Sequence, residues 1–189
     1  MSKLYVALTH YPVVNKSGAV IASAVTNLDL HDIARVAKTY GVPTFYVVTP
    51  LADQQELARK IICHWTSGVG ARYNPARRRA LELVRIEASI KAVVADIADR
   101  EKGSPHIVVT CAKRIKGSIG YATLRAMLRN GRPHLLVFGT AWGLASDFIA
   151  EADCVLEPVA GNSDYNHLSV RSAAAIILDR LLGTADETD

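Results

Sequence analysis

The chain has 189 residues, and 22 Lys and Arg against 18 Asp and Glu give a formal charge of +4. Half of the residues are apolar and 21% are charged, which excludes intrinsic disorder. No apolar run approaches the roughly 20 residues of a membrane helix, and no signal-peptide layout opens the chain, so we expect a cytoplasmic protein. We expect one domain over residues 1–184 and a frayed acidic tail over residues 185–189.

The first half of the chain alternates between strand and helix patterns. Residues 4–8 form an apolar run typical of a buried strand, and a polar, Gly-containing stretch follows to about residue 26. The next apolar positions have helical spacing up to Gly41. Residues 43–48 are rich in aromatic and β-branched side chains, which predicts a strand, and Pro50 then opens a predicted helix over residues 51–62. Residues 64–75 have two glycines and no period, which predicts a loop.

The second half continues the alternation. The expected strands are residues 81–86, 106–110, 134–138 and 154–157. The expected helices are residues 89–98, 119–128 and 168–182. Alternating strands and helices predict an α/β, Rossmann-like fold with a mostly parallel sheet and helices on both faces.

Three loops that leave the ends of late strands stand out, at residues 110–114, 138–144 and 156–161, and the last two contain Gly139, Gly143 and Gly161. Ligands of parallel sheets bind outside the carboxyl ends of the strands, and small residues let a ligand reach the backbone. Each glycine alone has the alternative role of permitting a tight turn. The G-x-G-x-x-G, P-loop and G-x-S-x-G motifs are missing, and no His or Cys pair has metal-ligand spacing, so no metal is expected. A ligand with adenine but little phosphate fits this pattern.

The run from residue 135 to 183 resembles the C-terminal half of SPOUT-superfamily RNA methyltransferases, and within them the SAM-dependent RNA methyltransferases related to the tRNA guanine methyltransferases. Residues 136–140, 156–161 and 167–176 are similar to three motifs of that superfamily. The resemblance implies a C-terminal deep trefoil knot, S-adenosyl-L-methionine (SAM) as cofactor, RNA (tRNA or rRNA) as substrate and a homodimer. Ser169 stands where the ribose-methylating branch usually has Asn, so both a base and a ribose stay open as targets.

The resemblance also implies the site residues. The expected cofactor-binding residues, acting mainly through their backbone, are Thr110, Phe138, Gly139, Thr140, Trp142, Gly143, Leu156, Glu157, Pro158, Val159, Gly161, His167, Leu168 and Ser169. The candidates for acceptor chemistry are Arg35, Asp164, Asn166, His167 and Ser169. Arg35 has the alternative of an exposed helix arginine, Asp164 that of capping the following helix, and His167 that of a structural histidine.

Clustered basic residues predict a polyanionic partner. The candidate RNA contacts are Arg72, Arg77, Arg78, Lys113 and Arg114, with a solvated surface as the alternative. The main functional prediction is an RNA methyltransferase. A non-catalytic SAM- or RNA-binding module of the same fold remains a second reading, and a Rossmann-type oxidoreductase is disfavoured because its glycine motif is missing.

Overall fold

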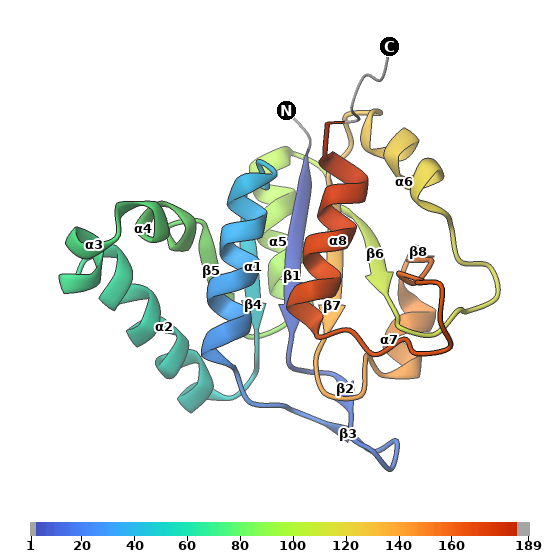
Figure 1. Cartoon of the computed structure of the whole chain (residues 1–189), viewed down its shortest axis with the longest axis horizontal. Coiled ribbons are helices and arrows are strands. Elements are labelled where there is room, and N and C mark those ends of the chain that lie inside the picture. The colour runs from blue at the N-terminus through green and yellow to red at the C-terminus, as the bar shows by residue number, and fades with distance from the viewer. Residues whose placement is uncertain (1–2, 185–189) are drawn as a thin grey trace.

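A computed structural model describes residues 3–184, and its centre is a six-stranded sheet in the order β5-β4-β1-β7-β6-β8 (Figure 1). All five strand pairs of this sheet are parallel. The strands are β1 (Leu4–Thr9), β4 (Phe45–Val48), β5 (Val84–Glu87), β6 (His106–Thr110), β7 (His134–Gly139) and β8 (Cys154–Leu156). The expected tail at residues 185–189 lies outside the described residues.

The central strands form because they are apolar along their whole length. Every residue of β1 and of β4 is buried, and in β7 only the final Gly139 is not. A parallel strand is covered on both faces, so a continuous apolar run fits it better than an alternating pattern does. Val6 in β1 pairs with Phe45 on one side and with Leu136 on the other, which fixes the register at the middle of the sheet.

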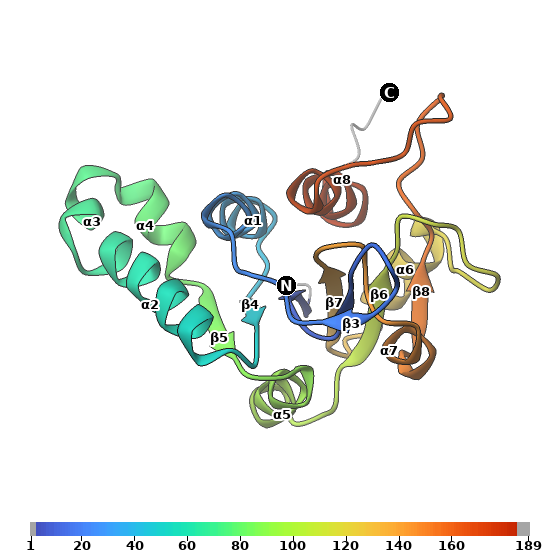
Figure 2. The same cartoon turned by 90° about the horizontal axis from the view of Figure 1, so that it is seen from below.

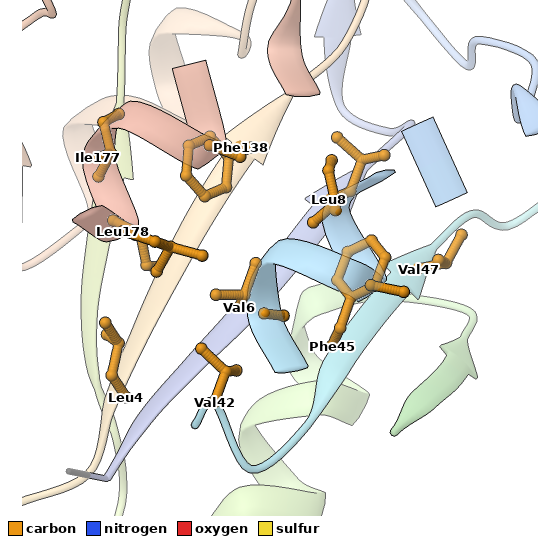
Figure 3. Close-up of a cluster of buried hydrophobic side chains, with 14 of the residues drawn as sticks. Leu4, Val6, Leu8, Val42, Phe45, Val47, Phe138, Ile177 and Leu178 are labelled. Carbon is orange, nitrogen blue, oxygen red and sulfur yellow. The ribbon is translucent and has the colours of Figure 1, made fainter. Parts of the chain in front are cut away.

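Helices cover both faces of the sheet. On one face, α1 (Asn27–Thr39), α6 (Tyr121–Leu128) and α8 (Val170–Leu182) pack on the core that Figure 3 shows in part. On the other face, α5 (Ile90–Glu101) and α7 (Ser146–Glu151) pack on a second core. The predicted α/β fold, with a mostly parallel sheet between two helical layers, is confirmed.

The predicted loop at residues 64–75 is wrong, because three helices occupy this region. They are α2 (Ala52–Thr66), α3 (Val69–Tyr73) and α4 (Pro75–Leu81), which lie beside the β5 edge of the sheet (Figure 2). The Asn74 side chain accepts the Arg77 N–H at 2.9 Å, and Pro75 occupies the first helical position, so this pair starts α4. Two short helices show no apolar period, which is why the pattern failed to reveal them. Because α4 extends to Leu81, the strand expected at residues 81–86 begins only at Val84.

Two further elements were absent from the sequence prediction. A hairpin of β2 (Val13–Val14) and β3 (Val20–Ile21) follows β1, and α7 follows β7. Strands of two residues are too short for an alternating pattern to show. Across residues 3–184, no helix is long and apolar enough to cross a membrane.

Candidate functional site

Three loops meet at the carboxyl edge of β7, β6 and β8, at the lower side of the molecule in Figure 1. We call them the β6 loop (residues 111–120), the β7 loop (residues 140–145) and the β8 loop (residues 157–169). The three strands are neighbours in the sheet, so the expectation that the three loops leave neighbouring strand ends is confirmed.

The β7 loop folds back tightly on its own strand. A Cβ on Gly139 would lie 2.8 Å from the Leu144 Cγ and 3.0 Å from the Leu144 backbone nitrogen. Leu144 is buried in the second core, and Gly143 turns the chain into it with a φ of +109°. Gly139 is therefore required by the return of the loop itself. Phe138 is one of the expected cofactor-binding residues. Its side chain is buried in the first core, so only its backbone faces the carboxyl edge of the sheet.

The hairpin holds the β7 loop in place. The Val14 N–H donates to the Gly143 carbonyl at 2.9 Å, and the Trp142 N–H donates to the Val14 carbonyl at 3.1 Å. The Thr140 hydroxyl donates to the Thr9 carbonyl at 3.2 Å and contacts the Ser23 hydroxyl. Because Thr140 uses its hydroxyl inside the protein and its carbonyl accepts the Gly143 N–H at 3.0 Å, its backbone N–H is the part left for a ligand. The hairpin had no signal in the sequence beyond its polar, Gly-containing composition.

The β6 loop returns to pair with β8. The Ile119 N–H donates to the Val155 carbonyl at 2.8 Å, and the Glu157 N–H donates to the Ile119 carbonyl at 2.9 Å. Since β8 pairs with β6 as well, the β6 loop crosses to the far side of β8 before α6 begins. Thr110 hydrogen-bonds the Val137 carbonyl at 3.1 Å through its hydroxyl, so its side chain also serves the sheet.

The β8 loop is largely exposed. Glu157, Pro158 and Val159 are half-buried, whereas residues 160–169 are all exposed. One side-chain hydrogen bond, from the Asn166 Nδ2 to the Ala112 carbonyl at 3.1 Å, connects this loop to the β6 loop. Buried Leu156 anchors the start of the loop, while a Cβ on Gly161 would meet nothing within 4 Å. The loop thus lies open to solvent between two fixed ends.

The far end of the β8 loop is fixed by the first turn of α8. The Ser169 hydroxyl accepts the Ser172 N–H at 3.4 Å and is the N-cap of α8. The alternative that Asp164 caps this helix is therefore wrong. Arg171 in the same turn bonds Asp29 at 3.2 Å and reaches Asp32 at 3.5 Å, which joins the starts of α8 and α1. Sequence reasoning missed Arg171, since its two partners lie about 140 residues away.

Of the candidates for acceptor chemistry, Arg35 lies on α1, whereas the other four lie in the β8 loop. It lines a groove of about 470 Å³ between α1 and α8 together with Asp32, Arg171 and Ser172. Within the described part of the chain, no hydrogen bond or ion pair joins Arg35 to Asp164 or His167. The His167 ring stands edge-on to Tyr165 with 6.4 Å between ring centroids, and its neighbour Leu168 is 44% exposed.

Burial perturbs two titratable groups near this edge. His10, at the end of β1, is completely buried, and neither ring nitrogen has a hydrogen-bond partner among residues 3–184. Burial lowers the pKa of His10, against the smaller opposing effects of the Val48 backbone and the Asp29 carboxylate, so the ring is neutral at pH 7. Burial and the neighbouring Asp153 raise the pKa of the Cys154 thiol to about 11, which leaves no thiolate at neutral pH.

The candidate RNA contacts form two groups at opposite edges of the sheet. Arg72, Arg77 and Arg78 lie on α3 and α4 beside β5, while Lys113 and Arg114 lie in the β6 loop beside β8. Arg77 stacks its guanidinium 4.2 Å from the Trp65 ring centroid, and Arg78 pairs with Glu82 at 2.8 Å. Arg72, Lys113 and Arg114 are exposed.

A family model described as SAM-dependent RNA methyltransferase matches residues 3–183. A protein of Oleidesulfovibrio alaskensis named tRNA (guanine-N(1)-)-methyltransferase is 47% identical over 182 residues, which cover 96% of this chain. The chain spans only 42% of that relative's length, so the printed activity is that of a much longer protein.

Two solved structures share the fold. The TrmH/SpoU tRNA modifying enzyme of A. aeolicus superposes with a TM-score of 0.57 and 18% identity over 96% of this chain and 75% of its own. An AdoMet-bound rRNA methyltransferase from Sinorhizobium meliloti superposes with a TM-score of 0.52 and 19% identity over 94% of this chain and 55% of its own. At such identities the likeness establishes the fold.

Proposed function

Because the chain belongs to the family of SAM-dependent RNA methyltransferases, we propose that it binds SAM at the carboxyl edge of β6, β7 and β8 and methylates an RNA. The observation that carries this proposal is the meeting of three loops at neighbouring strand ends, with the β7 loop closed over Gly139. The cofactor supplies an activated methyl group on a sulfonium. The protein then has to bind the cofactor, align the acceptor and remove an acceptor proton where there is one.

The backbone of the loops suits an adenosine-like ligand. The N–H groups of Gly161 and Leu168 have no hydrogen-bond partner in the described chain, and both residues are exposed. We assign cofactor contacts to the backbone of the β7 and β8 loops and of the strand ends before them. The residues are Thr110, Phe138, Gly139, Thr140, Gly143, Leu156, Glu157, Pro158, Val159, Gly161, His167, Leu168 and Ser169. Trp142, which the sequence also suggested, is left out because its N–H already donates to the Val14 carbonyl.

The proposal extends to a knotted backbone. Ile119 pairs on the far side of β8, whereas α8 returns to pack on α1 and β7. These two crossings support a path in which the β8 loop passes through the β6 loop. A crystal structure in which residues 157–169 run outside the β6 loop would contradict it.

We also propose that the protein forms a homodimer. Sedimentation equilibrium tests this directly.

The five candidates for acceptor chemistry fall into two groups, those whose side chains are hydrogen-bonded within the protein and those whose side chains are exposed. Asn166 and Ser169 make hydrogen bonds within the protein, so we assign them to holding the β8 loop and starting α8. Arg35, Asp164 and His167 keep their side chains exposed. We assign Arg35 to orienting the acceptor, and Asp164 or His167 to accepting its proton. Single-turnover methylation with Arg35→Ala, Asp164→Ala and His167→Ala tests this, and wild-type rates for all three would refute it.

RNA affinity tests the two basic groups separately. We propose that Arg72, Arg77 and Arg78 on one side and Lys113 and Arg114 on the other contact phosphates. Alanine at either group should weaken RNA binding and flatten its dependence on salt concentration, because fewer counterions are released. An unchanged slope for one group would place the RNA at the other edge.

Two measurements decide the activity. Calorimetry with S-adenosylhomocysteine should show binding of one cofactor per chain, and labelled SAM should transfer its methyl group to bulk RNA. Binding without transfer would instead support a non-catalytic SAM- or RNA-binding module. Mass mapping of the product identifies the nucleotide and distinguishes a base from a ribose. This step matters because the acceptor named for the longer relative belongs to that whole protein.

A further inference from the structure

An exposed tryptophan stands over a groove beside the proposed cofactor loop. Trp142, in the β7 loop, is 66% exposed, which is unusual for the largest apolar side chain. It lines a groove of about 480 Å³ with Asn15, Lys16 and Ser17, which form the turn of the β2–β3 hairpin. The groove therefore joins two segments that are far apart in the sequence.

The hairpin side of the groove is rigidly built. The Asn15 Oδ1 accepts the N–H of Ser17 at 2.9 Å, the hydroxyl of Ser17 at 2.7 Å and the N–H of Ala19 at 3.0 Å. Gly18 takes a φ of +83°, which closes the turn. These bonds use only the amide oxygen of Asn15, so its NH₂ group remains free to donate to a ligand. Lys16 has no carboxylate within 4.0 Å anywhere in residues 3–184, so its charge is unneutralised.

The two sides of the groove are tied together. The Trp142 N–H donates to the Val14 carbonyl, and Val13 forms a β-bridge with Leu144. Trp142 follows Gly139 by three residues, so whatever rests on its ring is held beside the loop that we assign to the cofactor. The groove is thus preformed and adjacent to the proposed cofactor loop.

We propose that this groove receives an unpaired nucleotide of the RNA substrate, whose base stacks on Trp142 and whose phosphate meets Lys16. This inference rests on the proposed function and names the substrate class at that site. An aromatic face beside a cation suits a single-stranded nucleotide, because every base offers a π-face and every nucleotide carries a phosphate. The Asn15 amide and the Ser17 hydroxyl add hydrogen-bonding groups at the base edge. Trp142, which the sequence suggested as a cofactor-binding residue, is thereby assigned to RNA binding.

Tryptophan fluorescence tests the stacking directly. The chain has two tryptophans, and Trp65 is covered by Arg77, so a Trp65→Phe background leaves Trp142 as the only reporter. Titration with unfractionated tRNA or a short single-stranded oligoribonucleotide should quench this emission. Trp142→Ala should lower tRNA affinity about 5- to 100-fold, whereas Trp142→Phe should retain most of it. Lys16→Ala should reduce the salt slope of binding by about one, and Lys38→Ala, in the last turn of α1, should leave it unchanged.

Cofactor affinity separates this inference from the proposed function. Trp142→Ala and Lys16→Ala should bind S-adenosylhomocysteine like the wild type. A loss of cofactor affinity in Trp142→Ala would return Trp142 to the cofactor site and overturn the inference. Unchanged tRNA affinity, or a change in oligomeric state in place of RNA affinity, would also overturn it. A wild-type protein that fails to bind S-adenosylhomocysteine would contradict the proposed function, while the fluorescence titration still reports on the groove.

Discussion

The β7 and β8 loops lie on either side of the carboxyl end of β6, yet the protein holds them in different ways. The β7 loop closes on Gly139, buries Leu144 and is hydrogen-bonded to the hairpin. Ten residues of the β8 loop are exposed. Its first residue, Glu157, contacts the β6 loop through the Ile119 carbonyl and an ion pair with Arg114 at 3.9 Å, and in the exposed part the side chain of Asn166 makes the bond to the β6 loop. One wall of the proposed cofactor site is therefore preformed, and the other is free to adapt.

This difference has an energetic meaning for ligand binding. A preformed wall lets a ligand bind without an ordering cost, whereas an open loop loses conformational freedom when a ligand fixes it. The ends of the β8 loop are anchored by Leu156 and by the first turn of α8, so only its middle has to be ordered. We therefore expect substitutions in the β7 loop to act on the fold, and substitutions in the β8 loop to act on binding and local mobility.

The largest effect should come from Gly139→Val. A Cβ at this position would meet Leu144 at 2.8 Å, so the β7 loop has to move away from its strand. Overpacking of this kind costs about 1–3 kcal/mol of the free energy of unfolding, and the displaced loop should abolish SAM binding. Calorimetry and urea denaturation measure both effects.

The matched control for Gly139→Val is Gly161→Ala in the β8 loop. Its new Cβ has nothing within 4 Å, so the free energy of unfolding should stay within about 0.5 kcal/mol of the wild type. Unchanged cofactor affinity in Gly139→Val would remove the β7 loop from the site.

Arg171→Met should give the next largest effect, by releasing the anchor at the end of the β8 loop. It leaves the Asp29 carboxylate, whose side chain is 11% exposed, without its cation. An unpaired and largely buried carboxylate should lower the free energy of unfolding by about 1–3 kcal/mol. The double variant Asp29→Asn/Arg171→Met should recover part of this loss, and Arg129→Met, at an exposed arginine, should cost little. Equal stability of Arg171→Met and the wild type would contradict the anchor.

The same contrast explains which features the sequence could reveal. Apolar runs predict β1, β4 and β7 because a parallel strand is buried on both faces, and they place the three loops at one edge. The role of Gly139 needed coordinates, since the glycine is there for Leu144, a contact that no local pattern encodes. The ion pair of Arg171 with Asp29 could not be predicted from the sequence for a similar reason, because only the fold brings the starts of α8 and α1 together.

A pH effect on stability should come from His10, which is buried at the end of β1. Burial lowers the pKa of His10 in the folded protein, so below about pH 6.5 the unfolded chain binds more protons than the folded one. Stability contributed by neutral His10 is thus fully present above the unfolded pKa and is lost as the pH falls towards the folded pKa. Urea denaturation between pH 7 and 5 should show a steeper loss for the wild type than for His10→Gln. The difference in slope has a limit of about 1.4 kcal/mol per pH unit.

His134, whose pKa is also lowered mainly by burial, is present in both proteins, so their difference isolates His10. Parallel stability curves for the wild type and His10→Gln would show that His10 takes up its proton without penalty in the folded state.

The smallest effect on stability should come from Asn166→Ala in the β8 loop. Its bond to Ala112 is exposed, so the free energy of unfolding should change by less than about 0.5 kcal/mol. Amide hydrogen exchange should nevertheless accelerate in residues 157–169, where the bond is lost, and stay unchanged in residues 140–145. Adding SAM to the wild type should slow exchange in the β8 loop more than in the β7 loop. Equal protection of both loops by SAM would mean that the open wall does not close on the cofactor, and the contrast between the two walls would then have no role in binding.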